Sequence, residues 1–92
     1  MREREIERYL VAECRRLGIL CYKFVSPQRA SVPDRILIAN GLVVFLELKA
    51  PGKLPTEAQE REMARIVEHG GMALHVNTIA GVNCLLNAIT NG

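Results

Sequence analysis

The sequence predicts a small mixed α/β fold in which helices cover one sheet. Its 92 residues suit one domain, spanning 1–92, with a single hydrophobic core. Segments with helical and strand periodicity alternate in the order α-β-β-β-α-β-α. Asn40-Gly41 separates two β-rich runs, and this pair is a strong signal for a tight hairpin. A mixed layer fold follows from that order of elements.

The first third of the chain predicts a helix, a strand and a loop. A helix is expected over Arg2 to Leu17, and Gly18 is suited to end it. A strand over Leu20 to Val25 and a polar loop over Ser26 to Val32 should follow. One face of the helix carries its apolar residues, which are Ile6, Leu10, Cys14 and Leu17.

The rest of the chain predicts a hairpin, two helices and a short strand between them. Residues 35–39 and 42–46 form the hairpin, and a loop rich in Pro and Gly covers 50–55. Thr56 and Gln59 have capping-box spacing, so a helix should begin there and end at Gly70-Gly71. A strand over Met72 to Val76 precedes a last helix capped by Thr78.

Composition excludes some functional classes and leaves others open. The net charge of +2 neither requires nor excludes a nucleic-acid partner, but nine of the twelve basic residues are arginine, which suits phosphate. The apolar runs are too short to cross a bilayer, and the N-terminus does not resemble a signal peptide, so a cytoplasmic protein is expected. The cysteines Cys14, Cys21 and Cys84 are expected to be reduced core residues.

The hairpin register places the only aspartate of the chain opposite a glutamate. With Asn40-Gly41 as the loop, facing residue numbers sum to 81, so Asp34 faces Glu47. The two carboxylates should share a sheet face, expected to be the core side, with Ile36, Ile38, Val43 and Phe45. Like charges in that position repel each other, so something must offset the repulsion.

The sequence offers two ways to offset the repulsion between these carboxylates. A divalent cation could be held by both carboxylates, and Lys49 lies two residues after Glu47 on the same face. Such a group suits phosphodiester hydrolysis, because the metal polarises the phosphate while the lysine orients a water. The alternative is that these residues are ordinary solvated charges at strand ends, and a β-bulge would shift the register.

Pro33-Asp34, the hairpin and Glu47-Leu48-Lys49 together resemble the PD-(D/E)XK nuclease superfamily. The match narrows to the VRR-NUC family, the virus-type replication-repair nucleases, and it implies a restriction-endonuclease-like αβββαβ core followed here by a C-terminal helix. The resemblance covers nearly the whole chain. Ser31 departs from the family pattern, where glycine is common, and this leaves the path of the loop open.

The resemblance also implies further site residues. Glu7 corresponds to an early helical glutamate that would bind metal, and the main-chain carbonyl of Leu48 would be a further ligand. Gln59 would support the catalytic centre, although its capping role explains it equally well. Glu7 has the alternative of being a helix-edge glutamate that reaches water. For DNA contacts, Arg29 and Lys53 are the candidates, and both histidines are expected to be structural.

The implied function is that of a Mg²⁺- or Mn²⁺-dependent DNA endonuclease. Stand-alone relatives are small homodimers that cut branched DNA, so the resemblance implies activity like that of a Holliday-junction resolvase on four-way junctions, in a bacterial or phage-infected cell. Two alternatives remain open. One is a flap or nicking nuclease, and the other is a DNA-binding module of the same fold without turnover.

Overall fold

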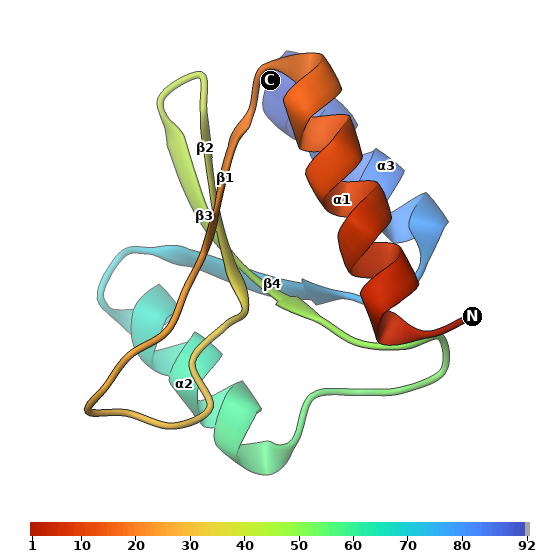
Figure 1. Ribbon diagram of the computed structural model, residues 1–92. Helices are drawn as coiled ribbons and strands as arrows, with labels where there is room; N and C mark the ends of the chain where they lie inside the picture. The colour runs from red at the N-terminus through yellow and green to blue at the C-terminus, as the bar shows by residue number, and fades with distance from the viewer. Residues whose placement is uncertain (92) are drawn as a thin grey trace.

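The computed structural model describes residues 1–91, so Gly92, the last residue of the predicted domain, lies outside the described part. Seven elements follow in the predicted order, and Figure 1 shows them around one sheet. They are α1 (Glu3–Leu17), β1 (Leu20–Lys23), β2 (Arg35–Ala39), β3 (Leu42–Leu48), α2 (Glu57–Glu68), β4 (Met72–Val76) and α3 (Ile79–Asn91).

The first helix ends as its sequence predicts. Gly18 takes the left-handed conformation with φ 75°, and the amide of Ile19 donates to the carbonyl of Cys14 at 2.8 Å. A glycine is suited to this position because it lacks the Cβ that disfavours positive φ. The turn sends β1 back along the last turn of α1.

The sheet has the strand order β1-β2-β3-β4, with β1, β2 and β3 antiparallel and β4 parallel to β3. The hairpin register is confirmed, since Ala39 pairs with Leu42 and the ladder continues to Arg35 with Leu46. Positive φ values of 51° at Asn40 and 78° at Gly41 are those of the predicted tight turn. Asp34 is the residue immediately before this ladder begins.

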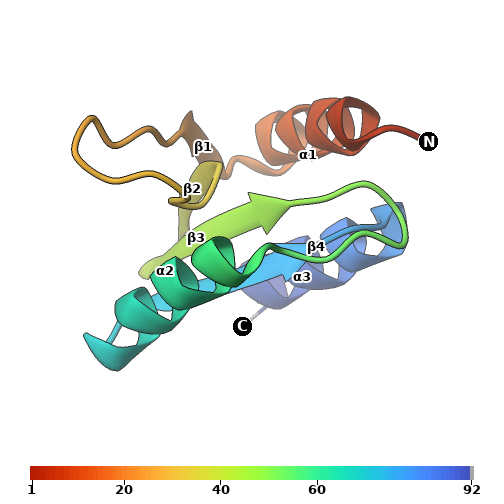
Figure 2. The same cartoon turned by 90° about the horizontal axis from the view of Figure 1, so that it is seen from below.

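Helices α1 and α3 lie side by side over one face of the sheet, as Figures 1 and 2 show. Their apolar stripes and one set of alternate strand residues form a single core. The fully buried residues of this core from the helices and the central strands are Ile6, Leu10, Cys14, Leu37, Val44, Leu46, Leu48, Val82 and Leu86.

The expected core side of the hairpin was wrong. Leu37, Val44 and Leu46 are buried against α1 and α3, whereas Ile38 and Val43 are exposed. Both faces of the hairpin carry apolar side chains, so alternation alone could not show which of them the helices cover. The two carboxylates still share a face, but it is the opposite one from the main core.

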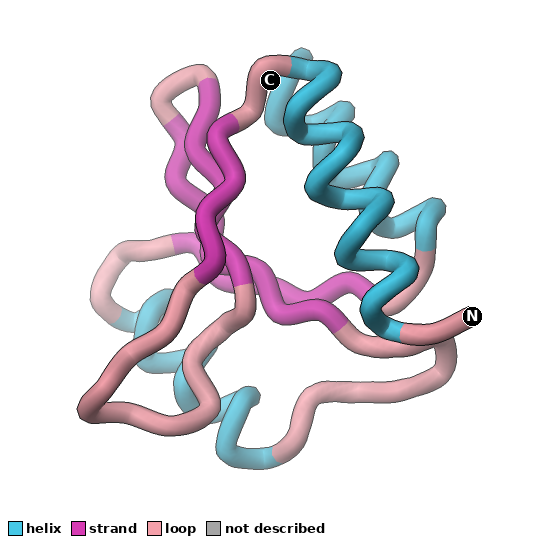
Figure 3. The backbone as a smooth tube through the Cα atoms, in the orientation of Figure 1, coloured by secondary structure: helices cyan, strands magenta, loops and turns pink. Residues whose placement is uncertain are grey.

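Helix α2 packs against β4 on that opposite face, and Figure 3 shows it apart from the α1–α3 pair. Its capping box is confirmed, because Gln59 N donates to Thr56 Oγ1 at 3.2 Å and Thr56 N donates to Gln59 Oε1 at 2.9 Å. Met63 is its buried residue. The part of this face over β1, β2 and the start of β3 has no helix upon it.

Three details complete the fold. Cys84 is exposed, so its expected core position was wrong, because it lies off the α3 stripe of Val82, Leu86 and Ile89. Ser31 has φ 66°, a conformation that favours glycine. Within residues 1–91, no helix has the length and apolar character needed to cross a membrane.

Candidate active site

Asp34 lies at the start of β2 and reaches across to β3. Its main-chain carbonyl accepts a hydrogen bond from Phe24 N at 2.8 Å, which ties the loop to β1. Its carboxylate Oδ2 accepts from the main-chain amide of Leu48, also at 2.8 Å. This bond fixes the aspartate side chain beside the last residues of β3, because a charged acceptor strengthens a hydrogen bond to an amide.

Glu47 is the one charged residue found in the interior of the described chain. It is only 2% exposed, and its Oε1 atom has no hydrogen-bond partner among residues 1–91. A buried polar atom without a partner is destabilising and calls for a physical explanation. This oxygen is therefore open to a ligand from outside the protein.

The surroundings of Glu47 oppose its charge. Burial raises its pKa to about 7, and the negative charges of Asp34 and, to a smaller degree, Glu3 act in the same direction. The Lys49 ammonium opposes this rise. The carboxylate pair therefore lacks a full cationic counterpart within the protein.

Lys49 stands beside Glu47, as the strand periodicity predicts. Its Nζ is 3.5 Å from Glu47 Oε2, and its side chain is 16% exposed. Its main-chain amide donates to Val76 O at 3.0 Å, so the end of β3 is held by β4. The structure thus brings Asp34, Glu47 and Lys49 together.

Glu7 does not join this group. Its Oε2 forms a part-buried ion pair with Arg35 at 3.0 Å, and Arg35 points to the opposite sheet face from Asp34, its neighbour in the chain. The helical acid whose charge reaches Glu47 is Glu3, in the first turn of α1. Sequence reasoning missed Glu3, although its spacing of three and seven from Ile6 and Leu10 borders the same helical stripe.

Leu48 contributes its main chain to the site, and Gln59 is engaged in the cap of α2. The amide of Leu48 binds Asp34 while its side chain is buried in the core, so its main chain lies at the site. In the capping box, the side-chain Oε1 of Gln59 accepts a hydrogen bond and its main-chain N–H donates one. Its local role is thereby accounted for, and a catalytic role remains a proposal.

Arg29 and Lys53 lie outside the carboxylate cluster. Arg29 is bound to Glu62 of α2, with Nη2 2.6 Å from Oε1. The same hollow between loop and helix, about 370 Å³, is also lined by Arg61 and Arg65, which the sequence did not single out. Lys53 is exposed in the loop after β3, and its carbonyl accepts from Asn77 at 2.9 Å.

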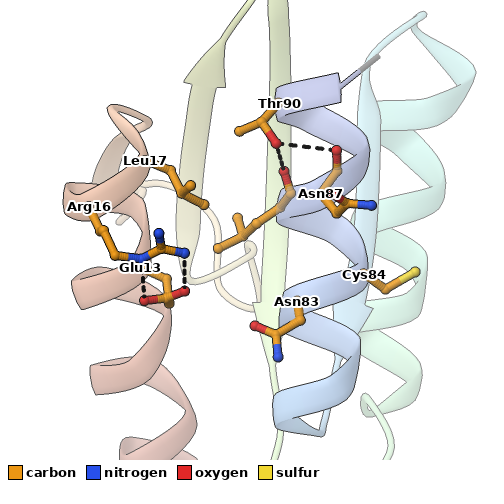
Figure 4. Close-up of a pocket in the computed structure, with 8 residues that line it drawn as sticks. Glu13, Arg16, Leu17, Asn83, Cys84, Asn87 and Thr90 are labelled. Carbon is orange, nitrogen blue, oxygen red and sulfur yellow. Dashed lines mark hydrogen bonds and ion pairs between the residues drawn. The ribbon is translucent and has the colours of Figure 1, made fainter.

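A larger hollow lies elsewhere in the molecule. It measures about 450 Å³ between α1 and α3, and Figure 4 shows its lining residues, which include Arg16, Glu13 and Cys84. The arginine and glutamate form an ion pair at 2.9 Å across one helical turn. Because none of the carboxylate cluster lines this pocket, its size does not mark the candidate active site.

The donor set at the end of β3 fits a hard divalent cation. Residues 1–91 contain no group of three or more His, Cys, Asp or Glu side chains arranged to hold a metal. Mg²⁺ does not need such a group, since it commonly takes one or two carboxylates together with waters and substrate oxygens. The partnerless Oε1 of Glu47, beside the Asp34 charge, is an oxygen suited to such an ion.

Comparisons with known proteins place this geometry in a family. No family model matches the chain. A protein of Acyrthosiphon pisum secondary endosymbiont phage 1, "Putative nuclease p44", is 51% identical over 71 residues, covering 76% of each chain. A solved VRR_NUC domain superposes with a TM-score of 0.83 at 25% identity, covering 92% of this chain and 94% of that one.

The chain belongs to the VRR-NUC family. A second solved structure, a VRR_NUC domain protein 18% identical to this chain, shares the fold with a TM-score of 0.82 over 99% of this chain and 89% of its own. The resemblance drawn from Pro33-Asp34 and Glu47-Leu48-Lys49 is confirmed. In this VRR-NUC chain the motif residues meet where β2 begins and β3 ends.

Proposed function

We propose that this VRR-NUC chain is a divalent-metal-dependent endonuclease that hydrolyses phosphodiester bonds in DNA. The observation that carries the proposal is the buried Glu47 carboxylate, whose Oε1 has no partner although Asp34 and Lys49 lie beside it. A fold that served only for binding would gain stability from a neutral residue there. Membership of a nuclease family supports the same conclusion.

We assign metal binding to the carboxylates and orientation of the attacking water to the lysine. Asp34, Glu47 and the main-chain carbonyl of Leu48 would hold Mg²⁺ or Mn²⁺, and the ion would supply Lewis acidity toward the phosphodiester. The Lys49 ammonium is held beside Glu47, where it can orient a water toward phosphorus and stabilise negative charge that develops on the phosphate oxygens. Glu3, whose charge acts on Glu47, is the helical acid available for a further role at the site, whereas Glu7 is paired with Arg35.

DNA would approach along the arginine-lined hollow between the 24–34 loop and α2. Arg61 and Arg65 add positive charge beside Arg29, whose own charge is partly neutralised by Glu62. Their guanidinium groups suit phosphates that flank the one being cut. Lys53 is exposed in the loop after β3 and would contact the DNA backbone outside this hollow.

A second copy of this chain is the partner that we propose for the open sheet face. The uncovered part of this face is formed by Leu20, Tyr22, Ile36, Ile38, Val43 and Phe45, and the carboxylate cluster lies at its end, beyond Ile36 and Phe45. Leu20, Tyr22, Ile38 and Val43 are exposed, and none of the six residues could bind a phosphate backbone. An exposed apolar patch of this kind marks a protein interface. Two copies related by a two-fold axis and joined through the exposed residues Leu20, Tyr22, Ile38 and Val43, away from the carboxylate cluster, would present two catalytic clusters to one DNA molecule.

This arrangement favours branched DNA as the substrate. Two cuts in a four-way junction need two centres held in a fixed relation, which a homodimer provides. A flap or nicking activity would need one centre only. The preference for a junction thus depends on the homodimer.

The test is cleavage of labelled DNA by the full chain. Linear duplex, flap and four-way junction substrates are incubated with Mg²⁺, with Mn²⁺ and with a chelator. We expect metal-dependent cleavage, fastest on the junction, that is lost in Glu47→Gln and retained in Glu68→Gln, which alters an exposed carboxylate at the end of α2. Failure to cut any substrate with either metal would overturn the proposal.

A further inference from the structure

The turn at Gly18 brings two cysteines together on the face away from the carboxylate cluster. Cys14 lies in the penultimate turn of α1 and is fully buried, and Cys21 lies on β1, partly exposed. The bond from Ile19 N to Cys14 O reverses the chain, so that β1 returns alongside the helix. Both cysteines line the same hollow of about 220 Å³.

The two thiols affect each other's ionisation. Interaction with the Cys14 thiol lowers the pKa of Cys21 to about 7, and interaction with Cys21, together with burial, raises the pKa of Cys14. The Arg35 guanidinium, held by Glu7, favours the thiolate form of Cys21. A thiolate is the reactive form of cysteine, so the accessible member of the pair is also the more nucleophilic one.

We propose that Cys14 and Cys21 are a redox-active pair that peroxides convert into a disulfide linking α1 to β1. The third cysteine, Cys84, lines a different hollow, the one between α1 and α3 that Figure 4 shows. The proposal is independent of nuclease activity, because neither thiol belongs to the group of Asp34, Glu47 and Lys49.

The reaction balances in two steps. The Cys21 thiolate attacks one oxygen of hydrogen peroxide, the O–O bond breaks, and the departing hydroxide takes a proton to become water. Cys21 is then a sulfenic acid. The Cys14 sulfur attacks the Cys21 sulfur, the S–S bond forms, the S–O bond breaks, and the leaving hydroxide takes the Cys14 proton as a second water. Two thiols lose two electrons, and the peroxide is reduced.

The experiment uses the full-length Cys84→Ser chain, which removes intermolecular pairing through the exposed thiol. Reduced protein is treated with hydrogen peroxide, blocked, digested and mapped by mass spectrometry. We expect a 14–21 cross-linked peptide with a mass loss of about 2 Da, restored by a dithiol reductant. A cross-link of the same kind is expected in the wild-type chain.

Two outcomes would overturn the proposal. One is that both thiols stay free after peroxide treatment, and the other is that Cys21 gains oxygen without forming the cross-link. A Cys14→Ser chain, if it folds, should instead accumulate sulfenic acid at Cys21, because the resolving thiol is gone. The mapping of the Cys84→Ser chain does not depend on that variant.

Discussion

At the scale of single residues, the carboxylate of Glu47 lies in surroundings that disfavour its own charge. Burial and the nearby Asp34 both raise its pKa, and its Oε1 has no partner among residues 1–91. The fold tolerates this arrangement because most of its stability comes from the separate core between the sheet and the α1–α3 pair. The site therefore carries a local destabilisation that a bound cation would relieve.

The metal-free protein should lose stability as the pH rises. Glu47 has a folded-state pKa of about 7 against an ordinary value of 4.5, so the folded state binds this proton more tightly. Its stabilising contribution is full below pH 4.5 and is lost as the pH rises through 7. Glu47→Gln should then be about 2 kcal/mol more stable than wild type at pH 8.

Urea unfolding at pH 5 and pH 8, in the presence of a chelator, measures this difference. The Glu68→Gln chain is the control, because that carboxylate is exposed and should leave the pH profile unchanged. Equal pH dependence of stability in wild type and Glu47→Gln would show that the pKa of Glu47 is not raised in the folded protein.

Lys49 should matter for the rate and much less for the fold. Lys49→Met should slow single-turnover cleavage by about 100-fold or more, because it removes the ammonium that we propose orients water and stabilises charge. Lys49→Arg should restore little, since a planar guanidinium does not replace a compact ammonium. The control is Lys23→Met, which alters an exposed lysine on β1 and should keep the wild-type rate. An unchanged rate in Lys49→Met would show that Lys49 has no part in the mechanism.

At the scale of elements, the hairpin and the α2 cap position the site. The tight Asn40-Gly41 turn sets the β2–β3 register, and that register brings Asp34 beside the end of β3. The Asn40 side chain also donates to Ile89 O at 2.9 Å, which ties the turn to α3. The capping box starts α2 at Thr56, so that the helix runs along β4 on the face of Glu47.

Two substitutions in the α2 cap separate its structural role from a catalytic one. Thr56→Ala should destabilise the protein by about 1 kcal/mol, because a capping acceptor is lost. Gln59→Glu should keep the cap and the Tm, since a carboxylate accepts the same bond from Thr56 N. We expect Gln59→Glu to reduce cleavage if its side chain supports the site. Wild-type cleavage in this variant would leave Gln59 as a capping residue only.

Most of the helices, strands and turns could be predicted from the sequence, because the residues that start and end them act locally. Gly18, the Asn40-Gly41 turn and the Thr56 cap each act within a few residues, and all three are confirmed. The covered face of the hairpin could not be predicted, since both faces are apolar and only α1 and α3 decide between them. The Glu7–Arg35 pair was missed for the same reason, as it joins segments 28 residues apart.

At the scale of the whole molecule, three helices leave part of one sheet face open. The last helix does not offer an apolar surface for a dimer, because its Val82, Leu86 and Ile89 are buried in the core. The apolar residues that remain exposed lie on the sheet, beside the strand that leads to Glu47. This arrangement of covered and open faces depends on packing over the full chain, which no local pattern in the sequence reports.

Light scattering should find a dimer at micromolar concentration for the wild-type chain. Val43→Lys should give a monomer with nearly unchanged stability, because this side chain is 45% exposed and its charge would be buried only in the dimer. Val67→Lys, which alters a residue of α2 that is 53% exposed, should leave the dimer intact. A wild-type monomer would contradict the homodimer and the junction preference that depends on it.

Calorimetric titration of Mn²⁺ into the full chain tests most directly whether Asp34 and Glu47 form a metal-binding catalytic centre. Saturable binding is predicted for wild type and for Glu68→Gln. In Glu47→Gln binding should be abolished or weakened by at least about tenfold, since removing one of two carboxylate ligands removes a charged contact to the ion. Equal Mn²⁺ affinity in Glu47→Gln and wild type would contradict the account.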